Sequence, residues 1–123
     1  MAAIDIERVT SIFVRICGLD VGSGHSDLIV RAVNKIEKAL TVPVLTYDQV
    51  LSCEYAAACE AAYEYALEEA SHERFVLSGL GSARKRSADA MTVEAADGLR
   101  KHAFAELSGI AELGGFIFEA AEG

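Results

Sequence analysis

The chain has no tryptophan and a single proline, Pro43, in 123 residues. Proline interrupts helices because it lacks the backbone N–H donor and its ring clashes with the preceding turn. Its scarcity in a sequence rich in alanine, leucine and glutamate favours an all-α fold. Hydrophobic residues make up 52% of the chain, which excludes a disordered protein. We therefore expect one domain with a single core.

Cysteine is scarce as well: the chain has only Cys17, Cys53 and Cys59. An odd number of cysteines without Cys-x-x-Cys spacing argues against a disulfide framework and favours a reducing compartment. The sequence has no run of eighteen apolar residues, and no basic segment precedes an apolar run near Met1. These features predict neither a membrane span nor a signal peptide.

Positive charge is in short supply, because 19 acidic residues stand against 11 basic ones and the formal net charge is −8. The imbalance is strongest between Asp48 and Arg74, where glutamates predominate. Tight or sequence-specific nucleic-acid binding needs clustered lysine and arginine, so the charge argues against it. The surface suits either a solvated helix face or a passage through which DNA slides without sticking.

The periodicity of apolar residues predicts a first helix over 5–17. Gly18 follows at the left-handed position that commonly ends a helix. The apolar face of this helix is predicted to contain Ile6, Val9, Ile12, Phe13 and Ile16.

A second helix is predicted over 27–40, with Ser23 or Ser26 as its cap and Lys35 facing outward. Pro43 lies beyond its end and pushes the preceding residue into an extended conformation. The inward positions of this helix are predicted to be Leu28, Ile29, Ala32, Val33, Ile36 and Leu40.

A third helix is predicted over 47–71, opening with Thr46 and Gln49 at the spacing of a capping box. Its many alanines give it a thin profile, so that neighbouring helices can approach closely. Phe75-Val76-Leu77 then favours β-structure, and 74–91 is predicted to be a long loop or hairpin.

A fourth helix is predicted over 93–113, with a break at Gly109 as an alternative. Taken together, the sequence predicts an all-α fold: a small antiparallel bundle of about four helices in residues 1–113. The loop 74–91 protrudes from this domain, and residues 114–123 form an extended C-terminal arm.

Two groups of acidic residues invite a chemical interpretation. Glu69 and His72 have the Glu-x-x-His spacing of di-metal helical bundles, but those sites need a second such pair, so a charge cluster at a helix end is favoured. Glu60, Glu64 and Glu68 recur every fourth residue, and we interpret them as an exposed row rather than catalytic carboxylates. Like charges at this spacing repel, which predicts a basic neighbour, on this or another subunit.

The segment from Gly79 to the basic triplet Arg84-Lys85-Arg86 lacks the Gly-Lys-Ser/Thr of a phosphate loop. The triplet is interpreted as a loop tip that contacts DNA or an acidic neighbour, or as a solvated loop. The sequence contains no Gly-x-Ser-x-Gly and no recognisable triad. We therefore expect no enzymatic activity, no cofactor and no metal.

Phe116, Ile117 and Phe118 form an apolar cluster that no helix period explains. Gly114 and Gly115 separate the cluster from the fourth helix. Two interpretations stay open: the segment folds back onto its own bundle, or it extends as an arm onto a partner.

Four segments together resemble the small head–tail connector (adaptor) proteins of tailed bacteriophages. They are AAACEAAYEYAL (56–67), RFVLSGLGS (74–82), GLRKHAFAEL (98–107) and GGFIFEA (114–120). The resemblance covers most of the chain and is strongest from Glu54 to Phe118. It is compositional, since none of these segments carries a catalytic motif.

The resemblance implies a structural virion protein of the head–tail junction, assembled in the host cytoplasm. Such subunits form a ring, commonly of twelve copies, that lies below the portal protein, extends the DNA channel and docks the next neck or tail component. It implies that Phe75, Val76 and Leu77 lead into the protruding loop, and that Phe116, Ile117 and Phe118 contact a neighbouring or portal subunit. A small cytoplasmic binding or regulatory module is the alternative, and a helical metalloprotein or enzyme is a third.

Overall fold

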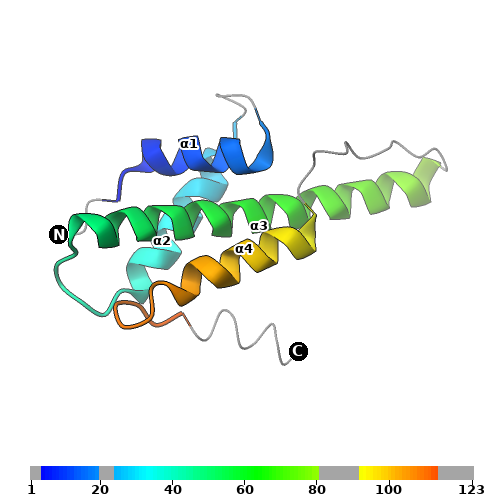
Figure 1. The fold of residues 1–123 in the computed structure, drawn as a ribbon. Coiled ribbons are helices and arrows are strands. Elements are labelled where there is room, and N and C mark those ends of the chain that lie inside the picture. Colours follow the sequence, from blue (N-terminus) through cyan, green and yellow to red (C-terminus); the bar gives the residue numbers. More distant parts are fainter. Residues whose placement is uncertain (1–3, 20–23, 81–91, 114–123) are drawn as a thin grey trace.

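The computed structural model describes residues 4–19, 24–80 and 92–113, with the backbone alone over 73–80. It contains four helices: α1 (Ile6–Cys17), α2 (Ser26–Ala39), α3 (Tyr47–Leu80) and α4 (Val93–Ala105). Figure 1 shows α1 and α3 running in one direction, α4 running back alongside α3, and α2 crossing behind α3 at a steep angle. The predicted all-α bundle is confirmed.

The first helix begins and ends where its flanking residues predict, and the third helix begins where predicted. The Asp5 side chain accepts a hydrogen bond from the Glu7 N–H at 2.9 Å, and Gly18 ends α1 with φ 69°. At the start of α3 the Thr46 N–H donates to the Gln49 side chain at 2.8 Å, and the Gln49 N–H donates back to the Thr46 hydroxyl at 3.2 Å. The predicted capping box is therefore present.

The cap of α2 differs from the prediction. The helix begins at Ser26 itself, so His25 is the capping residue, and its side chain makes no capping hydrogen bond. Instead its ring packs edge-on against Phe13 of α1 and Tyr65 of α3, with ring centroids 5.9 and 5.0 Å away. Ser23, the other predicted cap, lies outside the described residues.

The third helix is the centre of the bundle and is packed against α1, α2 and α4. Residues 56–62 are buried at every position, over almost two turns. A helix has 3.6 residues per turn, so this segment is covered on all sides. Its alanines make that possible, because small side chains let three helices approach one backbone closely.

The core around α3 contains most of the predicted inward positions. Val9 and Phe13 of α1 are buried, as are the predicted α2 positions other than Leu40, which is only partly buried. The prediction that Ile6 faces the core is wrong, since this residue is 45% exposed. Ile6 lies in the first turn of α1, where the helix has only begun to pack.

The far end of α3 corrects the predicted boundary. The helix continues past residue 71 to Leu80, so the backbone of Phe75-Val76-Leu77 is helical and the predicted β-favouring run does not leave the helix. Each added helical residue gains a hydrogen bond once a helix has formed, and Gly79 is the first strong breaker after Thr46. The remainder of the predicted loop, 81–91, lies outside the described residues.

The fourth helix ends earlier than predicted, at Ala105, and the break precedes Gly109. Gly109 adopts φ 95° in the turn that follows. The Thr41 N–H donates to the Ile110 carbonyl at 2.8 Å, and the Glu112 N–H donates to the Ala39 carbonyl at 2.7 Å. These bonds fasten residues 110–113 to the end of α2 and bury Leu113 in the core.

Candidate functional site

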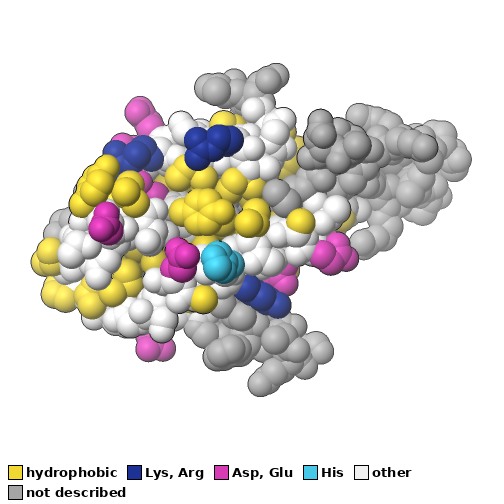
Figure 2. Space-filling model, in the orientation of Figure 1, with side chains coloured by type: hydrophobic (Ala, Val, Ile, Leu, Met, Phe, Trp, Pro, Cys, Tyr) yellow, Lys and Arg dark blue, Asp and Glu magenta, His cyan; other side chains and the backbone are white. Residues whose placement is uncertain are grey.

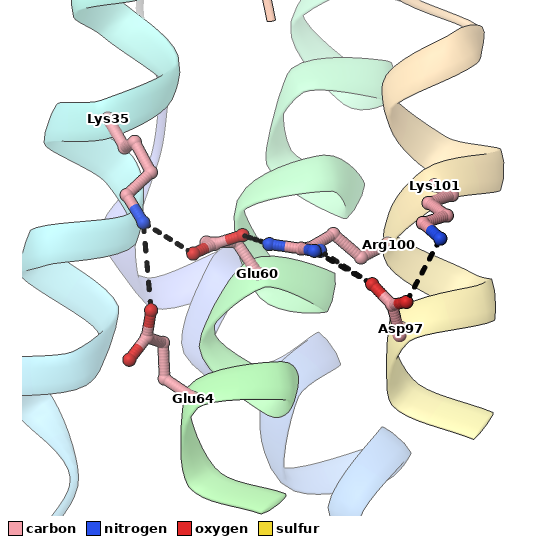
Figure 3. A network of polar contacts seen from close by, with 6 residues as sticks. All are labelled: Lys35, Glu60, Glu64, Asp97, Arg100 and Lys101. Atoms are coloured by element: carbon pink, nitrogen blue, oxygen red, sulfur yellow. Dashed lines mark hydrogen bonds and ion pairs between the residues drawn. The ribbon is translucent and has the colours of Figure 1, made fainter. Parts of the chain in front are cut away.

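Glu60 of α3 lies in the middle of a charged network that joins three helices (Figure 3). Its side chain is 1% exposed. Lys35 of α2 donates to one carboxylate oxygen at 2.6 Å, and Arg100 of α4 lies 3.4 Å from the other. A buried carboxylate needs such partners because the loss of hydration is costly.

The network continues outward on both sides of Glu60. On the α2 side, the Lys35 ammonium lies 3.6 Å from Glu64. On the α4 side, Arg100 donates to Asp97 at 2.7 and 3.2 Å, and Lys101 reaches the same carboxylate at 3.2 Å. Arg100 as a residue is only 4% exposed, and its guanidinium also lies 3.9 Å from the centroid of the Tyr63 ring.

Burial and pairing pull the pKa values of the network in opposite directions. Burial raises the pKa of Glu60 above its ordinary value, and Lys35 and Arg100 only partly oppose the rise. Burial also acts to raise the pKa of Asp97, but hydrogen bonds from Arg100 and Lys101 outweigh it and hold that pKa below its ordinary value. The pKa of Arg100 is lowered by burial and raised by Asp97 and Glu60, with a net rise. The guanidinium is therefore charged at every physiological pH.

A second buried carboxylate, Glu54, ties α1 to α3. Arg8 donates to both of its oxygens at 2.8 Å, in the bidentate geometry that guanidinium and carboxylate groups favour. The Asp5 N–H donates to one of the same oxygens at 2.8 Å. The carboxylate thus receives three hydrogen bonds from the start of α1.

These findings correct the prediction for the glutamate row. Glu60 is buried rather than exposed, and its basic neighbours are Lys35 and Arg100 of the same chain. Lys35 accordingly faces the bundle instead of pointing outward. Sequence reasoning missed Glu54 altogether. The available signal was that both glutamates stand among apolar residues over 53–63. In addition, the other three helices each carry a basic residue able to meet one of them.

The buried polar groups and thiols of the described interior are paired or unreactive. Within the described part of the chain, no buried side-chain nitrogen or oxygen lacks a hydrogen-bond partner. Cys17, Cys53 and Cys59 are buried thiols, and burial raises their pKa values to about 12, 11 and 11. The thiolate is the reactive form of cysteine, so these thiols are poor nucleophiles at neutral pH.

Of the predicted site residues, the structure describes only the backbone of Phe75-Val76-Leu77. The Phe75-Val76-Leu77 backbone belongs to the last turns of α3, whereas Arg84-Lys85-Arg86 and Phe116-Ile117-Phe118 lie outside the described residues. His72 is exposed and Glu69 half-buried. Among the described residues, no group of three or more histidine, cysteine or acidic side chains is placed to hold a metal ion.

The surface feature that sequence reasoning missed is a hollow of about 170 Å³ where the start of α3 meets the end of α4. It is lined by Asp48, Gln49, Ser52, Glu106, Ser108 and Ile110. We call this region the acidic end. Next to it along the chain, Tyr47 and Val44 are 71% and 70% exposed.

The face of the molecule turned to the viewer in Figure 1 has a mixed surface. Figure 2 shows the face between α1 and α4, with hydrophobic side chains gathered in its middle and acidic side chains and a histidine beside them. At the acidic end, Glu106 lies 3.6 Å from His102 in an exposed position. The described part of the chain offers Asp48 no ion-pair partner.

In comparisons with models of protein families, with curated proteins and with solved structures, no match was found. The helices among the described residues are all too short or too polar to cross a lipid bilayer.

Proposed function

We propose that the chain is a structural subunit of the head–tail junction of a tailed bacteriophage, where it forms a ring below the portal. Its sequence resembles that of connector proteins over most of its length, and its fold is the helical bundle that the resemblance implies. The ring extends the DNA channel and docks the next neck or tail component.

The observation that carries the proposal is that α3 is longer than the part of it that packs against the other helices. The helix has 34 residues, which corresponds to about 51 Å. The last of its described side chains to be buried is Ala66, and Figure 1 shows the C-terminal part extending past the ends of α1 and α4. Most helical stability in proteins comes from tertiary packing, so a projecting helix is well suited to packing against other subunits.

The interior supports a structural role as well. Its charged groups are paired with one another and its thiols are buried, so they serve to hold four helices in register. A bundle fixed in this way is a suitable rigid unit for a ring.

The test combines the purified full chain with a purified portal ring of the same phage. We expect the chain alone to be a soluble, mostly helical monomer or weak oligomer, and to close into a ring on the portal. Mass measurement and electron micrographs of the mixture report both states. A chain that stays monomeric or dimeric with the portal present would contradict the proposal and favour the small binding module.

A further inference from the structure

We propose that two free copies of the chain pair face to face through an apolar patch on the surface between α1 and α4, related by a two-fold axis that runs along α3. The patch consists of Ile12 of α1 and of Tyr47, Leu51 and Tyr55 of α3. The inference goes beyond the proposed function, because it concerns the chain before it meets a portal.

The patch follows one face of the first part of α3. Tyr47, Leu51 and Tyr55 are four residues apart, and a helix places such residues on one side. Tyr47 and Leu51 are 71% and 38% exposed, and Tyr55 is half-buried. Figure 1 shows α1 and α4 on opposite sides of α3, with α2 behind it, and Figure 2 shows hydrophobic side chains gathered on the open face. Adjoining exposed apolar side chains mark interaction surfaces.

The edge of the patch that α1 forms is basic. Arg8 and Arg15 are seven residues apart, so they lie on the same side of α1 with Ile12 between them. Arg8 lies against α3, because it bonds to Glu54 at 2.8 Å, and Figure 2 shows lysine or arginine side chains along this edge. Arg15 is exposed, and the described part of the chain offers it no ion-pair partner.

The opposite edge, where α4 ends, is acidic. Burial and Cys59 raise the pKa of the Tyr55 hydroxyl, and the negative charge of Glu106 adds to the rise, which places Glu106 close to the patch. The Glu106 side chain is 56% exposed and lies 3.6 Å from His102. The patch therefore lies between a basic edge and an acidic edge.

Opposite charges on its two edges make this face complementary to itself. A two-fold axis along α3 places the α1 edge of each copy opposite the α4 edge of the other, so that Arg15 faces the carboxylate of Glu106. A two-fold axis across α3 would place like charges opposite each other, which is unfavourable. Because the net charge of −8 opposes association of two copies, we expect the dimer to be weak.

Sedimentation of the full chain over a range of concentrations measures the pairing. We expect a monomer–dimer equilibrium that Leu51→Asp weakens by about tenfold, because it buries a charge in the middle of the contact. Val30→Asp is the matched control, since Val30 is 41% exposed on α2, outside the patch, and should leave the dissociation constant nearly unchanged.

Charge exchange tests the two edges without changing the apolar patch. Arg15→Glu and Glu106→Arg should each weaken the dimer, and both replacements in one chain should restore it, because opposite charges then face each other again. Tyr47→Cys and Leu51→Cys report the orientation, since an axis along α3 lets each form a disulfide with the same residue of the other copy in the presence of dissolved oxygen. An axis across α3 would bring at most one of these pairs together.

A wild-type chain that stays monomeric up to about 1 mM, which corresponds to a binding free energy weaker than about −4 kcal/mol, overturns the inference. So does a Leu51→Asp dimer as strong as the Val30→Asp dimer, or a double replacement that does not restore pairing. A monomeric chain whose Leu51→Asp variant fails to form rings on the portal overturns it in favour of a contact with the portal or a ring neighbour. Ring formation by the wild-type chain tests the proposed function separately.

Discussion

At the scale of single residues, the buried ion pairs determine which helix faces meet. Glu60 bonds to α2 and α4, and Glu54 bonds to α1. Buried ion pairs contribute little net stability, because desolvation offsets most of their attraction, but an unpaired buried charge is very unfavourable. A helix that docks in a shifted register would leave a glutamate unpaired. The two carboxylates thus select one arrangement among the many that a smooth alanine surface would allow.

Replacing Arg100 tests this interpretation. Arg100→Met removes one partner of Glu60 and leaves the carboxylate buried, so we expect the free energy of unfolding to fall by about 3 kcal/mol. Lys101→Met is the matched control, because the Lys101 side chain, which is 41% exposed, bonds to the same Asp97. This replacement should cost about 0.5 kcal/mol or less. Urea unfolding of both variants gives the comparison. Equal losses would show that the buried pair has no special role.

The raised pKa of Glu60 predicts a pH dependence of stability. The folded chain holds the Glu60 proton more tightly than the unfolded chain, so the contribution of this group is largest at low pH and falls as pH rises above its ordinary pKa of 4.5. Glu60→Gln removes the titration. The wild-type chain should therefore lose stability relative to Glu60→Gln as pH rises from 4 to 7.

Urea unfolding across this pH range measures the difference between the two proteins. Glu37→Gln, which replaces an exposed carboxylate on α2, controls for the loss of one negative charge. The prediction is wrong if the wild-type chain gains stability relative to Glu60→Gln as pH rises, because the ion pairs would then outweigh burial.

At the scale of the helices, the thin profile of α3 holds the bundle together. Ala57 is fully buried where α3 is covered on all sides, so Ala57→Leu should separate the packed helices and reduce stability by about 1–3 kcal/mol. Ala105→Leu makes the same change at an exposed position of α4 and should be nearly neutral, since leucine and alanine both favour helices. Thermal unfolding of the two variants separates packing from helix propensity. A neutral Ala57→Leu would contradict the packing described for α3.

The helices were predictable from sequence to the extent that local signals determine them. The starts of α1 and α3 and the stop at Gly18 follow from side chains within a few residues, and these predictions are confirmed. The extent of α3 beyond residue 71 was not predictable in this way, because Phe75-Val76-Leu77 favours strands in isolation and helices in a helical context. Strand propensity depends on neighbours that the sequence alone does not identify.

The candidate site was less predictable than the fold. Four-residue spacing places Glu60, Glu64 and Glu68 near one another on α3, but the spacing does not say which other helix covers that face. Which helix covers that face depends on how the bundle folds. Folding brings Lys35, which precedes Glu60 in the sequence, and Arg100, which follows it, to the same carboxylate. The hollow of the acidic end likewise combines residues from the start of α3 and the end of α4.

At the scale of the whole molecule, the described core is closed before the C-terminal segment begins. Leu113 is buried, and hydrogen bonds from Thr41 and Glu112 fasten residues 110–113 to the end of α2. Residues 114–123 carry Phe116, Ile117 and Phe118 and lie outside the described residues. Under the proposed function, we expect the bundle to serve folding and the terminal segment to serve assembly.

Truncation after Leu113 tests this division. The truncated chain keeps every described contact of the core, so its Tm should be nearly unchanged. Its incorporation into a ring on the portal should be lost, because two phenylalanines and an isoleucine no longer reach a partner. Leu113→Ala in the full chain is the opposite case: it should cost about 2–5 kcal/mol of stability and still permit incorporation below its own Tm. Calorimetry and the mass of assembled particles distinguish the two variants. If truncation instead unfolds the monomer, residues 114–123 belong to its own core, and the arm is not an assembly element.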